Sequence, residues 1–581
     1  MAFADTRDAQ FNFDASGNKN NWTPNNINSN ASSETTYDIM NDVATLTDED
    51  TANFATLNAV DLSNSSYTPT NANLTYNITG GNQNNQRGSI AVDSGKWYWE
   101  CTIQTGGGNA LIGVARADLK NDTTINFNSA NGWYYYGLTG NKYNSGNQGS
   151  YGSTYTTGDV IGFALDMDNG KIWWSKNGTW QASGDPAAGT NAGFTNVSGL
   201  VTSNVNNGFG GTLTGDYNYG QRPFKYTPPT GFKKLNTYNL PDSTIKDGSQ
   251  YMNTVLYTGN SSTNAITGVG FSPDWIWIKR RDSANAHQAY DSVRTLGYVL
   301  STSKTDAESD ETDKFVSIDS DGFTIQSNAG SHNLLNATYV AWNWRGSDSS
   351  AVSNTDGTIT STVSANTDSG FSVVTWTADT SSPNTIGHGL GQAPQVIISK
   401  RRSQTSNWGV YHHSNTSSPE TEVIYLNLTN ATTDLNNYWN DTAPTSSVFT
   451  VGSAYDQSED VVAYCFAEVE GFSKFGSYTG NGSTDGPFVY TGFRPAFVLF
   501  KRTNSTSNWI IFDQTRGLYN LNDNYLYANA SGAEGTSASS GVDLLSNGFK
   551  QRNTYTDANI SGSTYIYMAF AENPFKHSLA R

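Results

Sequence analysis

Cysteine is nearly absent from this sequence, and so are long apolar runs. Only Cys101 and Cys465 occur among the 581 residues, each inside a separate stretch of alternating apolar residues. A disulfide scaffold is therefore excluded, and both side chains are expected to be buried thiols. The longest apolar runs, such as residues 496–500, fall far short of the roughly 20 residues that a membrane-spanning helix requires. No membrane insertion is predicted.

Charge is also scarce, and most of it is acidic. Charged residues make up 14% of the chain, and 33 Lys and Arg against 51 Asp and Glu give a net charge of −18. The acidic excess is dispersed along the chain, whereas binding to phosphate groups needs clustered Lys and Arg. The composition therefore predicts no nucleic-acid partner.

Motifs for catalysis and metal binding are missing as well. The six His residues form no His-Glu-x-x-His pattern, and no nucleophile elbow or phosphate-binding loop occurs in a strand-to-helix context. Asp166, Asp168 and Gly170 resemble part of a calcium loop, but Asn177 stands where the bidentate Glu is needed. We therefore expect no catalytic residues, no metal and no cofactor. A glycoside hydrolase needs only two carboxylates close in space, so a polysaccharide depolymerase stays an alternative.

Glycine and aromatic residues are what the sequence has in abundance. It contains 56 Gly and 13% aromatic residues, and its short apolar runs are separated by clusters of Gly, Asn, Ser and Thr. Runs of this kind are typical of β-strands, and the length suits several domains. The sequence predicts an all-β, multidomain protein.

Residues 1–60 differ from the rest because they are rich in Asn and hold too few apolar residues for a core of their own. We expect them to form an extended N-terminal attachment arm, or else a peripheral strand of the next domain. The candidate anchors of this arm are its isolated large apolar residues, Phe11, Phe13, Trp22 and Phe54.

Three strand motifs stand out between residues 61 and 235. They are Gly95-Lys-Trp-Tyr-Trp-Glu-Cys-Thr-Ile103, Gly158-Asp-Val-Ile-Gly-Phe-Ala-Leu-Asp166 and Asp168-Asn-Gly-Lys-Ile-Trp-Trp-Ser-Lys-Asn-Gly178. The first alternates and predicts a half-buried strand. Two Asn-Gly pairs, at 169–170 and 177–178, supply the positive φ angles of tight hairpin turns.

In this order the motifs resemble the SPRY family. The matching features are Gly-x-Trp-Tyr-x-Glu at 95–100, Gly-Asp-x-Ile-Gly at 158–162 and Asp-x-Asp-Asn-Gly at 166–170. The resemblance implies a two-sheet antiparallel β-sandwich of the concanavalin-like type over residues 61–235. That fold is used mostly for binding, and the resemblance identifies no ligand.

An internal repeat follows the SPRY-like segment. Three times, a Pro is followed by an apolar run and then by Lys-Arg, at Pro273 to Lys279, Pro394 to Lys400 and Pro495 to Lys501. Each copy also has an aromatic-Thr pair upstream and closes on an aromatic strand. The repeat length is that of a compact domain, so we predict three tandem β-sandwich-like repeats at 236–350, 351–474 and 475–581, with Trp277, Ile398 and Leu499 on equivalent faces. The Lys-Arg pairs are interpreted as structural.

Recognition is expected from aromatic side chains outside the framework strands. The candidate ligand-binding residues are Trp133, Tyr134, Tyr135 and Tyr151, since they lie among Gly and Asn and combine flat apolar faces with polar groups.

An arm, a SPRY-like sandwich and tandem β repeats together resemble phage virion proteins of the tail-fibre or appendage kind. The resemblance implies a non-enzymatic, oligomeric structural protein, assembled in the host cytoplasm, that joins other virion proteins and binds a bacterial surface glycan or protein through its loops. A capsid-decorating or tail-body protein that binds only other virion proteins is the main alternative.

Overall fold

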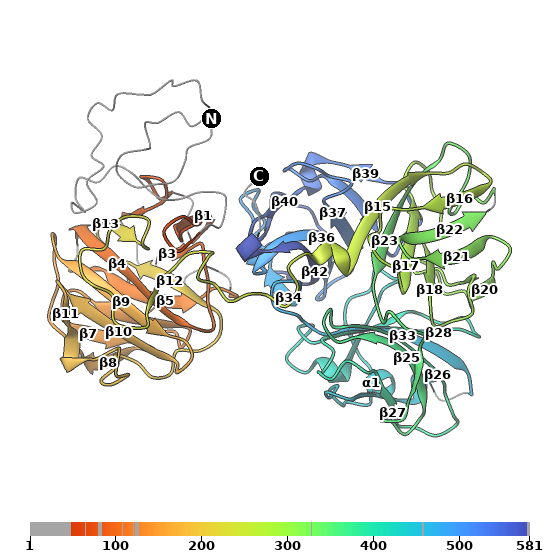
Figure 1. Cartoon of the computed structure of the whole chain (residues 1–581), viewed down its shortest axis with the longest axis horizontal. Coiled ribbons are helices and arrows are strands. Elements are labelled where there is room, and N and C mark those ends of the chain that lie inside the picture. The colour runs from red at the N-terminus through yellow and green to blue at the C-terminus, as the bar shows by residue number, and fades with distance from the viewer. Residues whose placement is uncertain are drawn as a thin grey trace. The chain divides into compact units, whose positions relative to one another are not determined.

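The computed structural model describes residues 48–577, except 64–65, 80–83, 107–108, 120, 122–126, 327 and 456–457. These residues form two compact units that divide at Asp242 (Figure 1). The expected all-β class is confirmed, since the helices of the described residues are single turns such as α1 (Asn436–Trp439). None of these helices has the length and apolar character that crossing a membrane would require.

The first unit is the expected antiparallel sandwich. One sheet has the order β1 (Leu57–Leu62), β3 (Asn85–Gly88), β12 (Val201–Asn206), β5 (Leu111–Arg116), β6 (Gly132–Tyr136), β7 (Asn141–Tyr143) and β8 (Asn147–Ser150). The other has the order β11 (Thr179–Trp180), β10 (Lys171–Lys176), β9 (Val160–Asp166), β4 (Lys96–Thr105), β13 (Leu213–Asn218) and β2 (Thr75–Ile78), and β14 (Lys233–Lys234) pairs with β4. Rings from the two sheets meet in the core, where Tyr135 and Trp174 lie 5.9 Å apart.

Both expected hairpin turns are present. Asn177 and Gly178 have positive φ angles and join β10 to β11 in a two-residue loop. The turn between β9 and β10 contains Gly170, also at positive φ. The expectation of a half-buried strand at Gly95–Ile103 is wrong, because Tyr98 and Glu100 on the second face of β4 are also buried. Glu100 accepts hydrogen bonds from the backbone N–H groups of Lys225 and Tyr226, so the segment that leads into β14 covers that face.

The second unit is built from three modules with one strand plan. Module 1 has a sheet of β15 (Met252–Thr258), β23 (Thr338–Trp344), β17 (Trp275–Arg280) and β18 (Gln288–Asp291), a small sheet of β16 (Thr263–Ile266), β22 (Gly322–Gln326) and β21 (Phe315–Asp319), and the pair β19 (Tyr298–Val299) and β20 (Ser309–Asp310). Module 2 has a sheet of β24 (Val352–Asn354), β25 (Ser361–Asn366), β26 (Phe371–Thr377), β33 (Asp460–Phe466), β28 (Val396–Arg401), β29 (Gly409–His412), β30 (Glu422–Tyr425) and β31 (Thr433–Asp434), with β27 (Asn384–Gly387) and β32 (Val448–Val451). Module 3 has a sheet of β34 (Ser473–Thr479), β42 (Thr564–Pro574), β36 (Phe493–Arg502), β37 (Trp509–Asp513), β38 (Asn524–Tyr527) and β39 (Gly535–Thr536), with β35 (Phe488–Tyr490), β41 (Gly548–Gln551) and β40 (Val542–Leu545).

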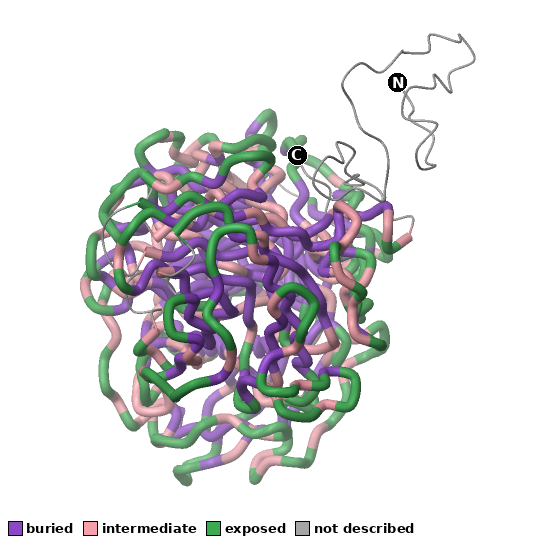
Figure 2. The backbone as a smooth tube through the Cα atoms, turned by 90° about the vertical axis from the view of Figure 1, so that its left-hand side faces the viewer, coloured by how far each residue is buried: buried purple, intermediate pink, exposed green. Residues whose placement is uncertain are grey.

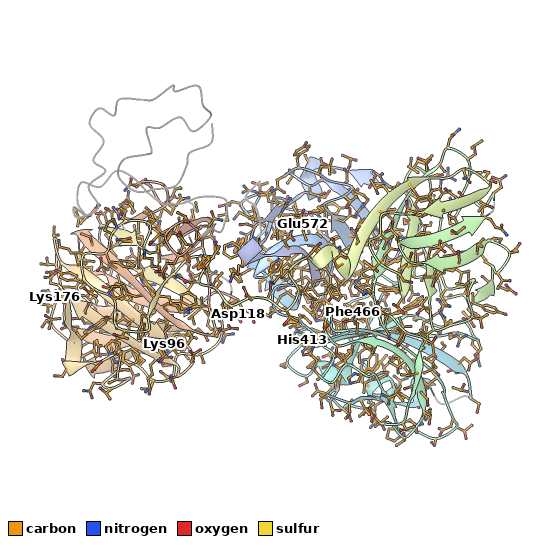
Figure 3. The ribbon with its side chains drawn as sticks, in the orientation of Figure 1. Lys96, Asp118, Lys176, His413, Phe466 and Glu572 are labelled. Carbon is orange, nitrogen blue, oxygen red and sulfur yellow. The ribbon has the colours of Figure 1, made fainter. Side chains whose placement is uncertain are left out.

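The modules share one large hydrophobic cluster, in which the three strands with the Lys-Arg signature all take part, and modules 1 and 2 each have a smaller cluster of their own. Trp277, Ile398 and Leu499 are buried in this core, as their equivalent positions predict. The ring centroid of Phe466, a residue labelled in Figure 3, lies 6.0 Å from that of Trp275 in module 1 and 6.2 Å from that of Phe475 in module 3. Figure 2 shows that the backbone in the interior is mostly buried and that much of the backbone at the periphery is exposed. The three segments are therefore modules of one unit around a common hydrophobic centre.

Each pair of modules is joined by the same hydrogen bond, which closes the modules into a ring. Trp408 Nε1 donates to the Ser301 carbonyl at 2.9 Å, and Trp509 Nε1 donates to the Tyr425 carbonyl at 2.8 Å. His287, at the equivalent position of module 1, places Nε2 3.0 Å from the carbonyl oxygen of Tyr527.

The lysine of each Lys-Arg pair is buried, in keeping with the structural role expected for it. Lys400 and Lys501 donate to carbonyl oxygens of the preceding module, at Thr305 and Thr429. Burial lowers the pKa of Lys279 and Lys400 to about 8 and that of Lys501 to about 7. The amino groups therefore contact backbone oxygens inside the fold.

The imidazole of His412 makes this unit sensitive to acid. His412 is buried, and burial, followed by the effect of His413, lowers its pKa to about 3, whereas an exposed histidine titrates near pH 6.5. Between about pH 6.5 and 3 the unfolded chain binds a proton that the folded protein does not, so stability falls as the pH falls. Between pH 7 and 5 this group should cost about 2 kcal/mol of unfolding free energy.

Denaturant titrations of wild type and His412→Gln at the two pH values measure this cost. The variant should lose about 2 kcal/mol less than wild type on acidification. Parallel pH profiles for the two proteins would show that His412 does not titrate in this way.

Candidate functional site

The four aromatic residues expected to bind a ligand lie inside the sandwich. Trp133, Tyr134, Tyr135 and Tyr151 are all buried, the most exposed being Tyr151 at 7%. Strand β6, which holds three of them, is paired on both sides by β5 and β7, and every residue in it is buried. Their assignment as a ligand-contacting surface is therefore corrected.

The polar tips of these side chains are hydrogen-bonded within the fold. Trp133 Nε1 donates to Asn196 Oδ1 at 3.1 Å, and Tyr134 Oη accepts from Asn204 Nδ2 at 2.8 Å. The Tyr135 hydroxyl donates to the Ser153 carbonyl. Buried Tyr and Trp side chains usually have hydrogen-bonded polar groups, as these do. Because the same residue types also occur in binding surfaces, the sequence alone did not distinguish the two roles.

Of the four residues expected to anchor the N-terminal arm, the structure describes one. Phe11, Phe13 and Trp22 lie outside the described residues. Phe54 is 5% exposed and forms an isolated bridge with Asn236, so it belongs to the framework of the first unit. Its assignment as a free attachment anchor is corrected, because its ring is already buried.

An aromatic cluster with one exposed ring lies at one end of the first sheet of this unit. We name it the Phe209 cluster, and it consists of Phe127, Tyr136, Tyr143 and Phe209. Phe209 lies in the turn between β12 and β13, and its ring centroid is 4.8 Å from those of Phe127 and Tyr136 and 6.2 Å from that of Tyr143. Tyr136 and Tyr143 are buried beneath it, whereas Phe209 itself is 46% exposed.

Local sequence explains why a large apolar side chain is held at the surface here. Gly208 permits close approach, since a Cβ atom at that position would come within 2.5 Å of the Phe127 ring. Gly210 and Gly211 adopt positive φ and turn the chain back into β13. Leu138, which is 57% exposed, lies in the turn after β6, two residues beyond Tyr136. The signal that could have identified this site is a lone Phe within the Asn-Asn-Gly-Phe-Gly-Gly loop at 206–211.

The two aspartates at the turn between β9 and β10 bond to other groups of the fold. Asp166 accepts from Asn169 and forms an ion pair with Lys96 at 3.2 Å, and Asp168 accepts from the Gly95 N–H at 2.6 Å. Lys96 is labelled in Figure 3. Within the described ranges, no group of three or more His, Cys, Asp or Glu is placed to hold a metal ion.

Two family models match the chain. The model described as SPRY domain matches residues 96–200, which confirms that resemblance. The model described as "Domain of unknown function (DUF7483)" matches residues 247–574, the region of the three modules.

Several curated proteins are similar to parts of the chain. A Ran-binding proteins 9/10 homolog of Drosophila melanogaster is 34% identical over 95 residues, Ran-binding protein 10 of Danio rerio is 28% identical over 143, and the ATP-dependent RNA helicase DDX1 of Xenopus laevis is 27% identical over 161. The matches cover 15%, 24% and 27% of this chain and only 10%, 21% and 20% of those proteins. The crystal structure of the SPRY domain of human HERC1 is 21% identical, with a TM-score of 0.24, and the match covers 28% of this chain and 96% of that one.

These relatives overturn the phage interpretation. They are cellular proteins of animals, so the predicted tail-fibre or appendage role, the virion location, the virion partners and the bacterial surface ligand are wrong. The capsid-decorating and depolymerase alternatives belong to the same virion setting and are set aside with it.

Proposed function

This chain belongs to the DUF7483 family, and because that family's description states no activity, we propose a function from the SPRY domain that precedes the family region: the chain binds another protein through the Phe209 cluster. In this proposal the chain acts by binding rather than by catalysis, and it needs no cofactor. The exposed ring of Phe209 on a buried aromatic platform is the observation that carries the proposal.

The names of the relatives support a protein as the ligand. Two of the three are named for binding Ran, and the third is an RNA helicase. Since the matches cover only 10% and 21% of the length of the Ran-binding relatives, the partner itself is not carried over to this chain.

The physical properties of the cluster suit protein recognition. Aromatic anchors that are rigid before binding lose little conformational entropy, and such residues dominate the binding energy of protein interfaces. The rings of Phe127, Tyr136 and Tyr143 hold Phe209 in place from below.

Selection of peptides from a random displayed library on the full chain, followed by affinity measurements, tests the proposal. We expect the selected peptides to bind at least tenfold more weakly to Phe209→Ser, a loss of about 1.4 kcal/mol or more. The melting temperature should change little, because Phe209 is already half exposed.

Tyr519→Ser is the matched control. Tyr519 is 82% exposed and is not a member of the cluster, so its replacement removes another exposed aromatic ring of similar size. Peptides that bind equally to all three proteins would show that the Phe209 cluster is not the recognition surface.

A further inference from the structure

We call the contact between two neighbouring modules a joint. Two of the three joints hold a network of charged side chains that is partly buried. Between modules 1 and 2, Arg294 bonds to Asp291 at 2.6 Å and to Glu308 at 3.2 Å, and Arg402 of the next module bonds to Glu308 at 2.8 Å. Between modules 3 and 1 the same network recurs, and its members are Asp513, Arg516, Glu534 and Arg281.

The joint between modules 2 and 3 has none of the four charged residues of this network. The equivalent positions hold His412, Asn415, Thr432 and Thr503. The buried aspartates of the other joints accept a hydrogen bond from the next module, as Asp291 does from the Tyr464 hydroxyl and Asp513 from Trp342 Nε1. Met568 takes that place in module 3 and has no donor, so an aspartate in the position of His412 would lack this bond.

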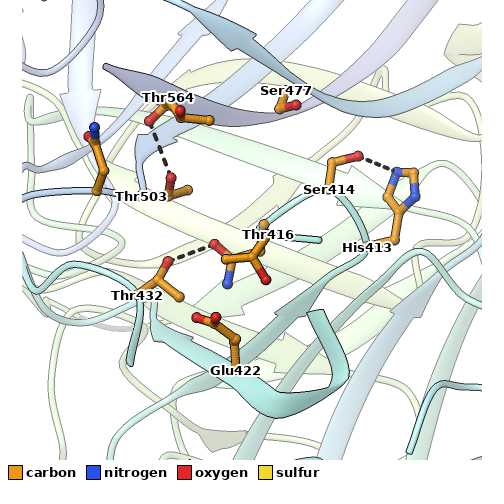
Figure 4. Close-up of a pocket in the computed structure, with 10 residues that line it drawn as sticks. His413, Ser414, Thr416, Glu422, Thr432, Ser477, Thr503 and Thr564 are labelled. Atoms are coloured by element: carbon orange, nitrogen blue, oxygen red, sulfur yellow. Dashed lines mark hydrogen bonds between the residues drawn. The ribbon is translucent and has the colours of Figure 1, made fainter. Parts of the chain in front are cut away.

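The short side chains leave a cavity of about 740 Å³ at this joint (Figure 4). Asn415, Thr432 and Thr503 all line it, so it lies where the other two joints are filled by Arg and Glu. The other lining residues bear mostly hydroxyl and amide groups, and none of the ten is Lys or Arg. A cavity of this size is typical of small-ligand sites.

The side-chain amide of Asn415 provides a buried hydrogen-bond donor in the cavity. Asn415 is 96% buried and accepts from the Thr432 hydroxyl at 2.6 Å, but among the described residues its Nδ2 atom has no hydrogen-bond partner. A buried donor without an acceptor costs about 1–3 kcal/mol, so a ligand oxygen here would be stabilising.

Glu422 supplies the one carboxylate of the lining, and Figure 4 shows it directed toward Thr416 and Thr432. It lies directly opposite Asp434 in the pairing of β30 and β31. Burial raises the pKa of Glu422, a hydrogen bond with the Thr416 side chain opposes this rise, and the charge of Asp434 adds to it. Like charges facing each other across strands are destabilising, so a cation beside Glu422 would offset their repulsion.

We propose that this cavity binds an arginine-bearing ligand, whose guanidinium pairs with Glu422 while a carbonyl or carboxylate oxygen beside it accepts from Asn415. The ligand takes the place that Arg281 and Arg402 fill at the other two joints. A guanidinium is matched to a carboxylate because two parallel N–H groups can bond to its two oxygens. This site lies in the second unit, so it is independent of the Phe209 cluster.

Calorimetric titration of the full chain with L-arginine, with N-acetyl-L-arginine N-methylamide and with L-citrulline tests the proposal. Citrulline has the shape of arginine without its charge and should bind at least tenfold more weakly than arginine. Equal binding of the blocked derivative would identify an arginine side chain of a peptide as the natural ligand, and binding of arginine alone would identify the free amino acid.

Two variants locate the binding in the cavity. Glu422→Gln should weaken arginine binding at least tenfold, whereas Glu420→Gln, outside the lining, should bind like wild type. Thr432→Glu/Thr503→Arg should restore the ion pair of the other joints, fill the cavity and abolish binding. Equal affinity for citrulline, unchanged binding by Glu422→Gln, or no binding of either arginine compound at millimolar concentration would overturn the proposal.

Discussion

Replacement of Trp275 by alanine is expected to lower the free energy of unfolding of the second unit by about 3–5 kcal/mol, the cost of deleting a large buried aromatic side chain. Trp275 is 1% exposed and lies where modules 1 and 2 meet, with its ring 4.5 Å from that of Trp344 and 4.3 Å from that of Tyr464. The substitution leaves a cavity between the two modules and removes packing contacts from both of them. Rearrangement of one module is therefore not expected to fill it.

Denaturant titration followed by tryptophan fluorescence measures this loss. Tyr519→Ala, which removes an exposed ring from the same unit, should change the unfolding free energy by less than about 0.5 kcal/mol. A loss of under about 1 kcal/mol in Trp275→Ala would contradict the shared core, because a peripheral residue behaves in that way.

The second large effect is expected from the buried charges at the joints. Arg294→Ala leaves Asp291 buried without its ionic partner and should cost about 3–5 kcal/mol. Asn415 holds the equivalent position at the uncharged joint, so Asn415→Ala removes one neutral hydrogen bond and should cost about 1 kcal/mol.

Comparison of the two alanine variants by chemical denaturation tests whether the joints differ in this way. Asp291→Asn combined with Arg294→Ala should recover part of the loss, since no uncompensated aspartate charge remains. Equal losses in Arg294→Ala and Asn415→Ala would show that the charged network is not what distinguishes the joints.

Local patterns in the sequence predicted much of the fold. The Asn-Gly turns at 169–170 and 177–178 and the motif order around Trp97 depend on neighbours in the chain, and they predicted the SPRY sandwich. The register from each Pro to its Lys predicted equivalent strands in the three modules. Such patterns are set by backbone conformation and strand periodicity, which short segments specify on their own.

What the sequence did not predict depends on pairs of residues far apart in the chain. The second face of β4 is buried by residues more than a hundred positions away, and Trp408 bonds to Ser301 in another module. Aromatic residues in β6 looked available because their burial depends on such distant contacts. The exposure of Phe209 was not predicted, because it depends on the conformation of a glycine-rich loop and not on the alternation of buried and exposed residues along a strand.

Hydrogen–deuterium exchange of the full chain with and without a selected peptide is the most direct measurement of the proposed binding function. We expect the peptide to slow amide exchange in 127–143 and 207–211, the segments that contain the Phe209 cluster, and to leave residues 243–577 unchanged. Slower exchange confined to 243–577, or unchanged exchange in both of these first-unit segments, would contradict recognition through the Phe209 cluster.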